Sequence, residues 1–163
     1  MKGGRAVTFV RTWAGTAARI VLAAVLGYAG WVKVQDLTGA GRTVALYQLV
    51  PEESAQLVGA AVAFVELALA LLLLAGLATR AVAAVTALLM VTYITAIASV
   101  WARGMSIDCG CFSSGGTLTG GAERGYVVDI ARDLAFLGAA AFLITRPRTR
   151  YALDRLVLET KER

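Results

Sequence analysis

The sequence predicts an all-α protein, a four-helix transmembrane bundle whose N- and C-termini both lie in the cytoplasm. Three observations support this prediction. Hydrophobic residues make up 58% of the 163 residues and charged residues only 17%, whereas soluble domains average about 45–50% and about 25%. The apolar residues gather in four long stretches, and basic residues gather at both ends of the chain. The mean hydropathy of +0.70 excludes a disordered chain.

Each of the four apolar stretches is long enough to cross a bilayer. A hydrocarbon core about 30 Å thick requires about 20 helical residues at 1.5 Å each. The expected spans are residues 16–34, 55–78, 81–100 and 126–144. Only Thr79 and Arg80 remain to join the second span to the third. The fourth span is the most polar, because Asp129, Arg132 and Asp133 fall in its first half.

The distribution of basic residues predicts the orientation in the membrane. Residues 1–19 carry four basic residues and no acid, and residues 145–163 carry six basic residues and three acids. Positive charge flanking apolar spans marks the cytoplasmic side, so both termini and Arg80 are expected there. Because these charges flank the spans, we expect a lipid bilayer and not nucleic acid as the partner of the basic segments.

The connections between the spans complete the topology. The loops 35–54 and 101–125 are close to neutral, which places them outside the cytoplasm. Residues 1–145 are therefore expected to form one four-span domain of the cell membrane, followed by a basic cytoplasmic tail, residues 146–163.

The two cysteines are the sharpest chemical feature of the sequence. Cys109 and Cys111 are separated only by Gly110 and fall in the second outer loop, where oxidising conditions allow disulfides to persist. A bridge between them closes almost no loop and adds little stability. It also stretches the usual Cα separation of about 4.4–6.8 Å, although a glycine lets the backbone bend. Strained, exposed bridges tend to be labile or catalytic, so we predict redox exchange.

Two other interpretations of the cysteines stay open. The first is a pair of free thiols, or a bridge that only shapes the loop. The second is a copper(I) or zinc site, since thiolates bind both ions. The chain has no histidine, and Met105 is the only other nearby sulfur ligand, so no metal is predicted.

Glu66 is the second candidate site residue, because it lies in the middle of the second span. A lone carboxyl at this depth is costly and marks a site with a partner. We expect Arg132 to approach it from the fourth span. The alternative is a polar contact that only joins helices.

A cation is expected near the cysteines, because the adjacent Asp108 disfavours a thiolate. Arg132, Lys33 and Arg103 are the candidates for this role. Lys33 is also expected to anchor the first span at the membrane interface. Asp129 and Asp133 lie at helical spacing around Arg132, so the alternative for this arginine is a neutralised cluster with its two acids.

A pattern of residues from about Arg19 to Leu137 resembles a known family. Its members are Arg19, Gly30-Trp31-Val32-Lys33, Leu49-Val50-Pro51, Glu66, Gly104, Asp108-Cys109-Gly110-Cys111-Phe112 and Arg132-Asp133. The chain is similar to the MauE family of the DoxX-like membrane proteins. The family string usually continues with glycine where this chain has Ser113. The resemblance implies a four-helix membrane protein that works with a thioredoxin-like partner in maturation of periplasmic, disulfide-rich methylamine dehydrogenase.

The expected function is extracytoplasmic thiol–disulfide exchange with a thioredoxin-fold protein. One cysteine pair cannot relay electrons between two internal disulfides, so a membrane quinone is the expected second redox partner. Whether the chain is itself an oxidoreductase or a subunit of one is left open. The alternatives are a non-catalytic assembly factor and a small transporter, which Glu66 favours.

Overall fold

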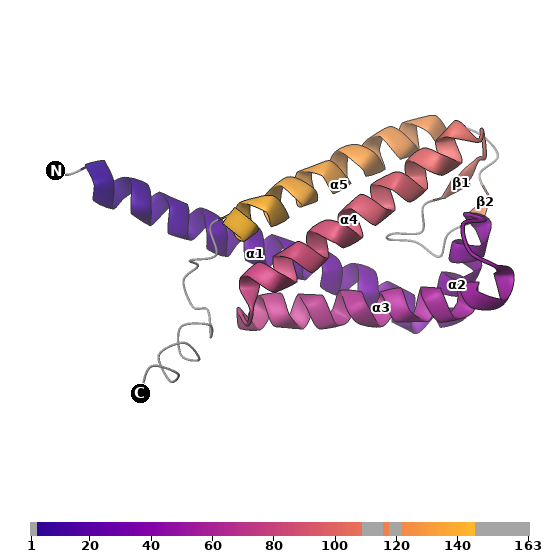
Figure 1. The fold of residues 1–163 in the computed structure, drawn as a ribbon, viewed down its shortest axis with the longest axis horizontal. Coiled ribbons are helices and arrows are strands. Elements are labelled where there is room, and N and C mark those ends of the chain that lie inside the picture. The colour runs from indigo at the N-terminus through magenta and orange to yellow at the C-terminus, as the bar shows by residue number, and fades with distance from the viewer. Residues whose placement is uncertain (1–2, 109–115, 118–121, 146–163) are drawn as a thin grey trace.

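A computed structural model describes residues 3–108, 116–117 and 122–145. Over these residues the fold is all-α apart from one short strand pair (Figure 1). The helices are α1 (Gly3–Gln35), α2 (Leu37–Leu46), α3 (Glu52–Ala75), α4 (Thr79–Ala102) and α5 (Ala122–Thr145). The strands are β1 (Ile107–Asp108) and β2 (Gly116–Thr117). The expected cytoplasmic tail, 146–163, lies outside the described residues.

Three of the described helices are long and apolar enough to cross a membrane. They are the segment Trp13–Gln35 of α1, Glu52–Ala75 and Thr79–Ala102. These confirm the first three apolar stretches as helices of membrane-spanning length. The fourth stretch is also helical, and α5 has 24 residues, as α3 and α4 do. Because it carries more charged residues, α5 is not among the helices apolar enough to span a membrane. Its crossing of the bilayer stays a prediction.

The long helices pack as two pairs. Helix α1 packs along α3, α4 packs along α5, and the pairs meet mainly where α1 touches α5 (Figure 1). Glycines allow the closest approaches. A Cβ on Gly30 of α1 would lie 2.9 Å from the Ala63 carbonyl oxygen and from Leu67 of α3. Small residues at such contacts let helix backbones approach each other within a membrane.

The turn between α3 and α4 differs from the expected Thr79-Arg80 connection. Helix α3 ends at Ala75, and Gly76 takes the left-handed conformation with φ of 65°. Its N–H and that of Leu77 donate to carbonyls of the last turn, as in a glycine-capped helix end. Thr79 and Arg80 are the first residues of α4. The prediction was wrong because Leu77 is apolar, so the hydropathy of the sequence does not fall at the turn.

Helix α2 lies within the segment 35–54, where a loop was expected. Asp36 caps its N-terminus, where the side chain accepts a 2.7 Å hydrogen bond from the Gly39 N–H. Glycines lower helix propensity, and Gly39 and Gly41 hide this helix from a propensity argument. Gly41 also lets α2 pack against α3, since it lies directly against Gln56.

Candidate functional site

The predicted redox centre, Cys109-Gly110-Cys111, lies outside the described residues. Both flanks of the segment 109–115 are described. Strand β1 ends at Asp108 and β2 begins at Gly116, and the two pair antiparallel with Asp108 opposite Gly116. The chain therefore enters and leaves the cysteine segment at two neighbouring points.

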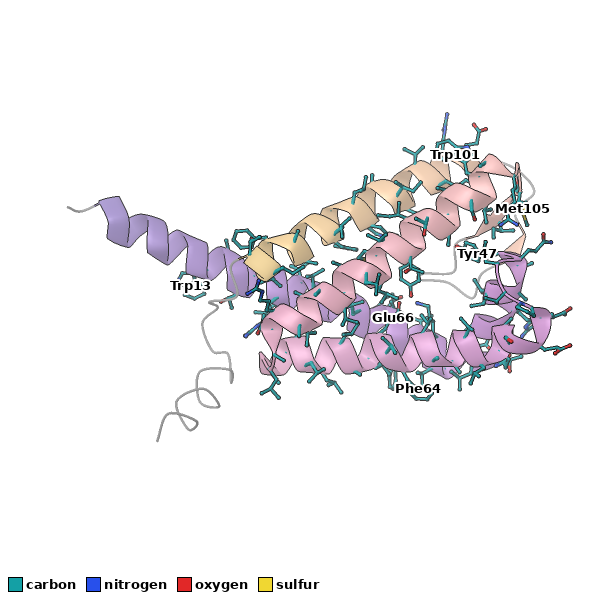
Figure 2. The ribbon with its side chains drawn as sticks, in the orientation of Figure 1. Trp13, Tyr47, Phe64, Glu66, Trp101 and Met105 are labelled. Carbon is teal, nitrogen blue, oxygen red and sulfur yellow. The ribbon has the colours of Figure 1, made fainter. Side chains whose placement is uncertain are left out.

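Tyr126 connects strand β1 to helix α5 through hydrogen bonds of its hydroxyl group. The Tyr126 hydroxyl, near the start of α5, accepts a 2.8 Å hydrogen bond from the Ile107 N–H. It donates another of 2.8 Å to the Met105 carbonyl oxygen. The Tyr126 ring lies 6.3 Å from the ring of Trp101, centroid to centroid. Figure 2 shows Trp101, Met105 and Tyr47 gathered at this end of the molecule.

Arg103 ties the same end of α4 to the end of α2. Its guanidinium donates to the Tyr47 carbonyl oxygen and, at 3.1 Å, to that of Ser99. Arg103 was one of three cations expected to favour a thiolate at the cysteines. Its described contacts are with the backbone carbonyls of Tyr47 and Ser99 and with the Ser99 hydroxyl, and its action on the cysteines stays a prediction.

Glu66 is almost completely buried, with 1% of its surface exposed, and it pairs with a lysine. Lys33 Nζ lies 2.8 Å from Glu66 Oε2 and 3.1 Å from Oε1. The Tyr93 hydroxyl of α4 also donates to Glu66 Oε1. In Figure 2, Glu66 points from α3 toward α4, whereas the nearby Phe64 points away from the bundle. The expected pairing of Glu66 with Arg132 is therefore wrong.

The Lys33 side chain is only 11% exposed and contacts Glu66 within the bundle, and its expected role as an anchor at the membrane interface stays a prediction. Gly30 packs against the middle of α3, at Ala63 and Leu67. Glu66 lies between these two contacts, and Lys33 is about 4.5 Å beyond Gly30 along the helix axis, from where its long side chain reaches the Glu66 carboxylate. The sequence showed the charge at the end of an apolar stretch but not how α1 is positioned along α3.

Arg132 pairs with the two acids of its own helix. Its Nη1 lies 2.8 Å from Asp129 Oδ1, and its Nε and Nη2 each lie 3.0 Å from Asp133 Oδ1. This is the neutralised cluster that the helical spacing allowed. An approach of Arg132 to the cysteines concerns residues outside those described and stays a prediction.

These groups form one polar layer across the bundle, to which all four long helices contribute. We define the polar layer as Lys33, Glu66, Tyr93, Asp129, Arg132 and Asp133. Lys33 connects it, because Lys33 contacts Glu66, lies 5.8 Å from the Tyr93 ring centroid and interacts electrostatically with Asp133. The layer joins the α1–α3 pair to the α4–α5 pair. Tyr93 is not among the expected site residues, because its spacing from Glu66 along the chain gives no signal of their contact.

The polar layer lies between two apolar clusters. One contains Leu22, Leu26, Leu73 and Leu143 and extends toward the α3–α4 turn. The other contains Ile97, Val100, Ile107 and Tyr126 and lies below the strand pair. The layer therefore has apolar packing on both sides along the bundle, and the strand pair that flanks the cysteine segment adjoins the second cluster through Ile107.

The family described as "Methylamine utilisation protein MauE" matches residues 11–146. No curated protein and no solved structure matches the chain. The matched region contains the polar layer, the strand pair and the cysteine segment.

Proposed function

Because the chain belongs to the MauE family, we propose that this membrane protein carries out thiol–disulfide exchange at the extracytoplasmic face through Cys109 and Cys111. The observation that carries the proposal is the strand pair on either side of the cysteine segment, with β1 fastened to α5 by Tyr126. A site that must meet another protein's disulfide benefits from a fixed attachment, because a preorganised group loses less freedom on binding.

The proposal includes four membrane spans with both termini in the cytoplasm. The start of α1, the α3–α4 turn and the end of α5 lie toward one end of the molecule, and α2 and the strand pair lie at the other (Figure 1). Arg80 and the basic N-terminal segment thus share the end that the positive-inside rule assigns to the cytoplasm. The cysteine segment then belongs to the opposite face.

The proposed reaction moves two electrons through one disulfide. A thiolate of a thioredoxin-fold partner attacks the Cys109–Cys111 bridge and forms a mixed disulfide, releasing one cysteine as a thiolate. The partner's second thiolate then breaks the mixed disulfide, which leaves the partner oxidised and both cysteines reduced. Transfer of two electrons and two protons from this dithiol to a membrane quinone restores the bridge and yields a quinol.

The family's description suggests the biological setting. Members are described as methylamine utilisation proteins, and we propose that this chain supports maturation of a disulfide-containing extracytoplasmic enzyme of that pathway. The enzyme's disulfides are then the final destination of the oxidising equivalents.

Trapping of the mixed disulfide tests the proposal. In membranes, Cys109→Ser or Cys111→Ser keeps one thiol, which can attack the disulfide of an oxidised thioredoxin-fold partner. A reductant-sensitive adduct is expected to accumulate, since this chain no longer has the second thiol that would complete the exchange. A membrane-impermeant maleimide should label the wild type from outside only after reduction. The double variant is the control and should form no adduct. If neither single variant forms an adduct and both keep full activity, the redox proposal is wrong, and a non-catalytic assembly role takes its place.

A small transporter is the second candidate, because the polar layer places buried charges on three of the long helices. Buried charges in a membrane bundle often mark a solute or ion path. Solute uptake by proteoliposomes that survives replacement of both cysteines by serine would favour this candidate over thiol exchange.

A further inference from the structure

Asp133 has a buried oxygen that the ion pairs leave unused. The residue is 3% exposed, and both contacts with Arg132 fall on Oδ1. Among the described residues, Oδ2 has no hydrogen-bond partner. A buried anionic oxygen without a donor is unfavourable, because it has lost water and gained nothing in return.

The balance of charges in the polar layer also indicates that one carboxyl group is neutral. Within the described part of the chain, the layer holds three carboxyl groups, Glu66, Asp129 and Asp133, and two cations, Lys33 and Arg132. If all were ionised, one negative charge would remain uncompensated between two apolar clusters. Neutralisation by a proton is the usual outcome for an uncompensated buried carboxylate.

The contacts identify which carboxyl group carries the proton. Both carboxylate oxygens of Glu66 accept hydrogen bonds from Lys33, and one also accepts from the Tyr93 hydroxyl. Glu66 therefore has the donors that an anion needs. The Asp129 side chain is 19% exposed and pairs with Arg132 Nη1, so water shares its charge. Asp133 is left with the more buried position and one unsatisfied oxygen.

We propose that the polar layer is a proton-binding site in which Asp133 Oδ2 carries the proton. The groups that act on Asp133 are Arg132 and Asp129 from α5 and Lys33 from α1, whose charge Glu66 of α3 shares; Tyr93 of α4 acts through Lys33 and Glu66. Loss of the proton adds a negative charge where the two helix pairs meet. The proton site holds under either proposed function, because it requires no cysteine chemistry.

Infrared spectroscopy of the full chain in phosphatidylcholine vesicles tests this site. At neutral pH, the wild type is expected to show the C=O stretch of one protonated carboxyl group, with a deuterium shift in heavy water. Asp133→Asn should remove the band, and the matched control Glu123→Gln, at the exposed start of the same helix, should keep it. A rise in pH should bleach the band reversibly. Absence of the band from the wild type, or its survival in a folded Asp133→Asn protein, overturns the proposal.

A second measurement on the wild type removes the dependence on folding of the variant. A hydrophobic carbodiimide modifies only protonated carboxyl groups, so mass spectrometry should find the adduct at Asp133. An adduct at Glu66 instead of Asp133 overturns the assignment. Protection of Asp133 by sodium ions at constant pH also overturns it, because the neutralising ligand would then be a metal cation.

Discussion

Lys33, close to the C-terminal end of α1, places its Nζ 2.8 Å from Oε2 of Glu66, in the middle of α3. Glu66 is buried and Lys33 is largely so, and the Tyr93 hydroxyl of α4 also donates to Glu66. Burial of two charges is not by itself a source of stability, because their desolvation offsets the attraction between them. The same burial favours the observed arrangement of α1 along α3, since a shift that separates the two charges would leave each one buried without the other.

Removal of either charge should therefore cost more than removal of both. Glu66→Gln or Lys33→Met leaves a buried charge uncompensated, and each is expected to lower the free energy of unfolding by about 3–5 kcal/mol. The double variant should recover much of this loss. Thermal unfolding in detergent measures the cycle, with Glu53→Gln on the exposed start of α3 as the control. Losses that simply add would show that the two charges act independently.

The packing of α2 against α3 gives a second prediction. A Cβ on Gly59 would lie 2.7 Å from backbone atoms of Ala40 and Gly41, and backbone cannot rotate away. Gly59→Ala is expected to destabilise the protein by about 1–3 kcal/mol through overpacking. Gly138→Ala is the matched control in another long helix, because a Cβ there meets no heavy atom within 4 Å. Equal thermal stability of the two variants would contradict this contact.

Tyr126 gives a third prediction, which concerns the attachment of the cysteine segment. Tyr126→Phe removes the hydroxyl that joins the Ile107 N–H to the Met105 carbonyl. Two lost hydrogen bonds at about 0.5–1.5 kcal/mol each should loosen β1 from α5. Hydrogen exchange at the Ile107 amide should accelerate, and alkylation of the reduced cysteines should change in rate. Tyr28→Phe, on an exposed face of α1, should leave both unchanged. An Ile107 amide that stays equally protected in Tyr126→Phe would show that the strand is held by other contacts.

The sequence predicted the long helices well, because their signal is the length of each apolar stretch. The expected fourth span, 126–144, falls within α5, Ala122–Thr145. The turn at Gly76 and the helix Leu37–Leu46 were harder to find. The turn gave no signal because Leu77 is apolar. Helix α2 gave none because its glycines lower helix propensity, and its stability depends on its contact with α3.

The pairing of charges could not be predicted from depth. Depth along separate helices suggested Arg132 as the partner of Glu66, but it gives neither the rotation of each helix nor its shift along a neighbour. Gly30 sets that shift for α1 by packing against Ala63 and Leu67. The pairing of Arg132 with Asp129 and Asp133 could be predicted from the sequence, since it depends only on spacing within one helix.

Arg132 gives the last prediction, because its charge and its geometry can be separated. Arg132→Gln leaves Asp129 and Asp133 near each other without a cation, and a stability loss of about 3–5 kcal/mol is expected. Arg132→Lys keeps the charge but cannot reproduce contacts from Nε, Nη1 and Nη2 to two carboxylates, so it should recover only part of the loss. Adding Asp129→Asn to Arg132→Gln should recover stability by removing one of the two acids.

The pH dependence of cysteine alkylation in membranes provides the second readout for Arg132. A shift to higher pH in Arg132→Gln that Arg132→Lys reverses would assign the arginine a role in favouring the thiolate. If the alkylation profiles coincide while stability falls, Arg132 acts only through its ion pairs, and Arg103 becomes the cation to test.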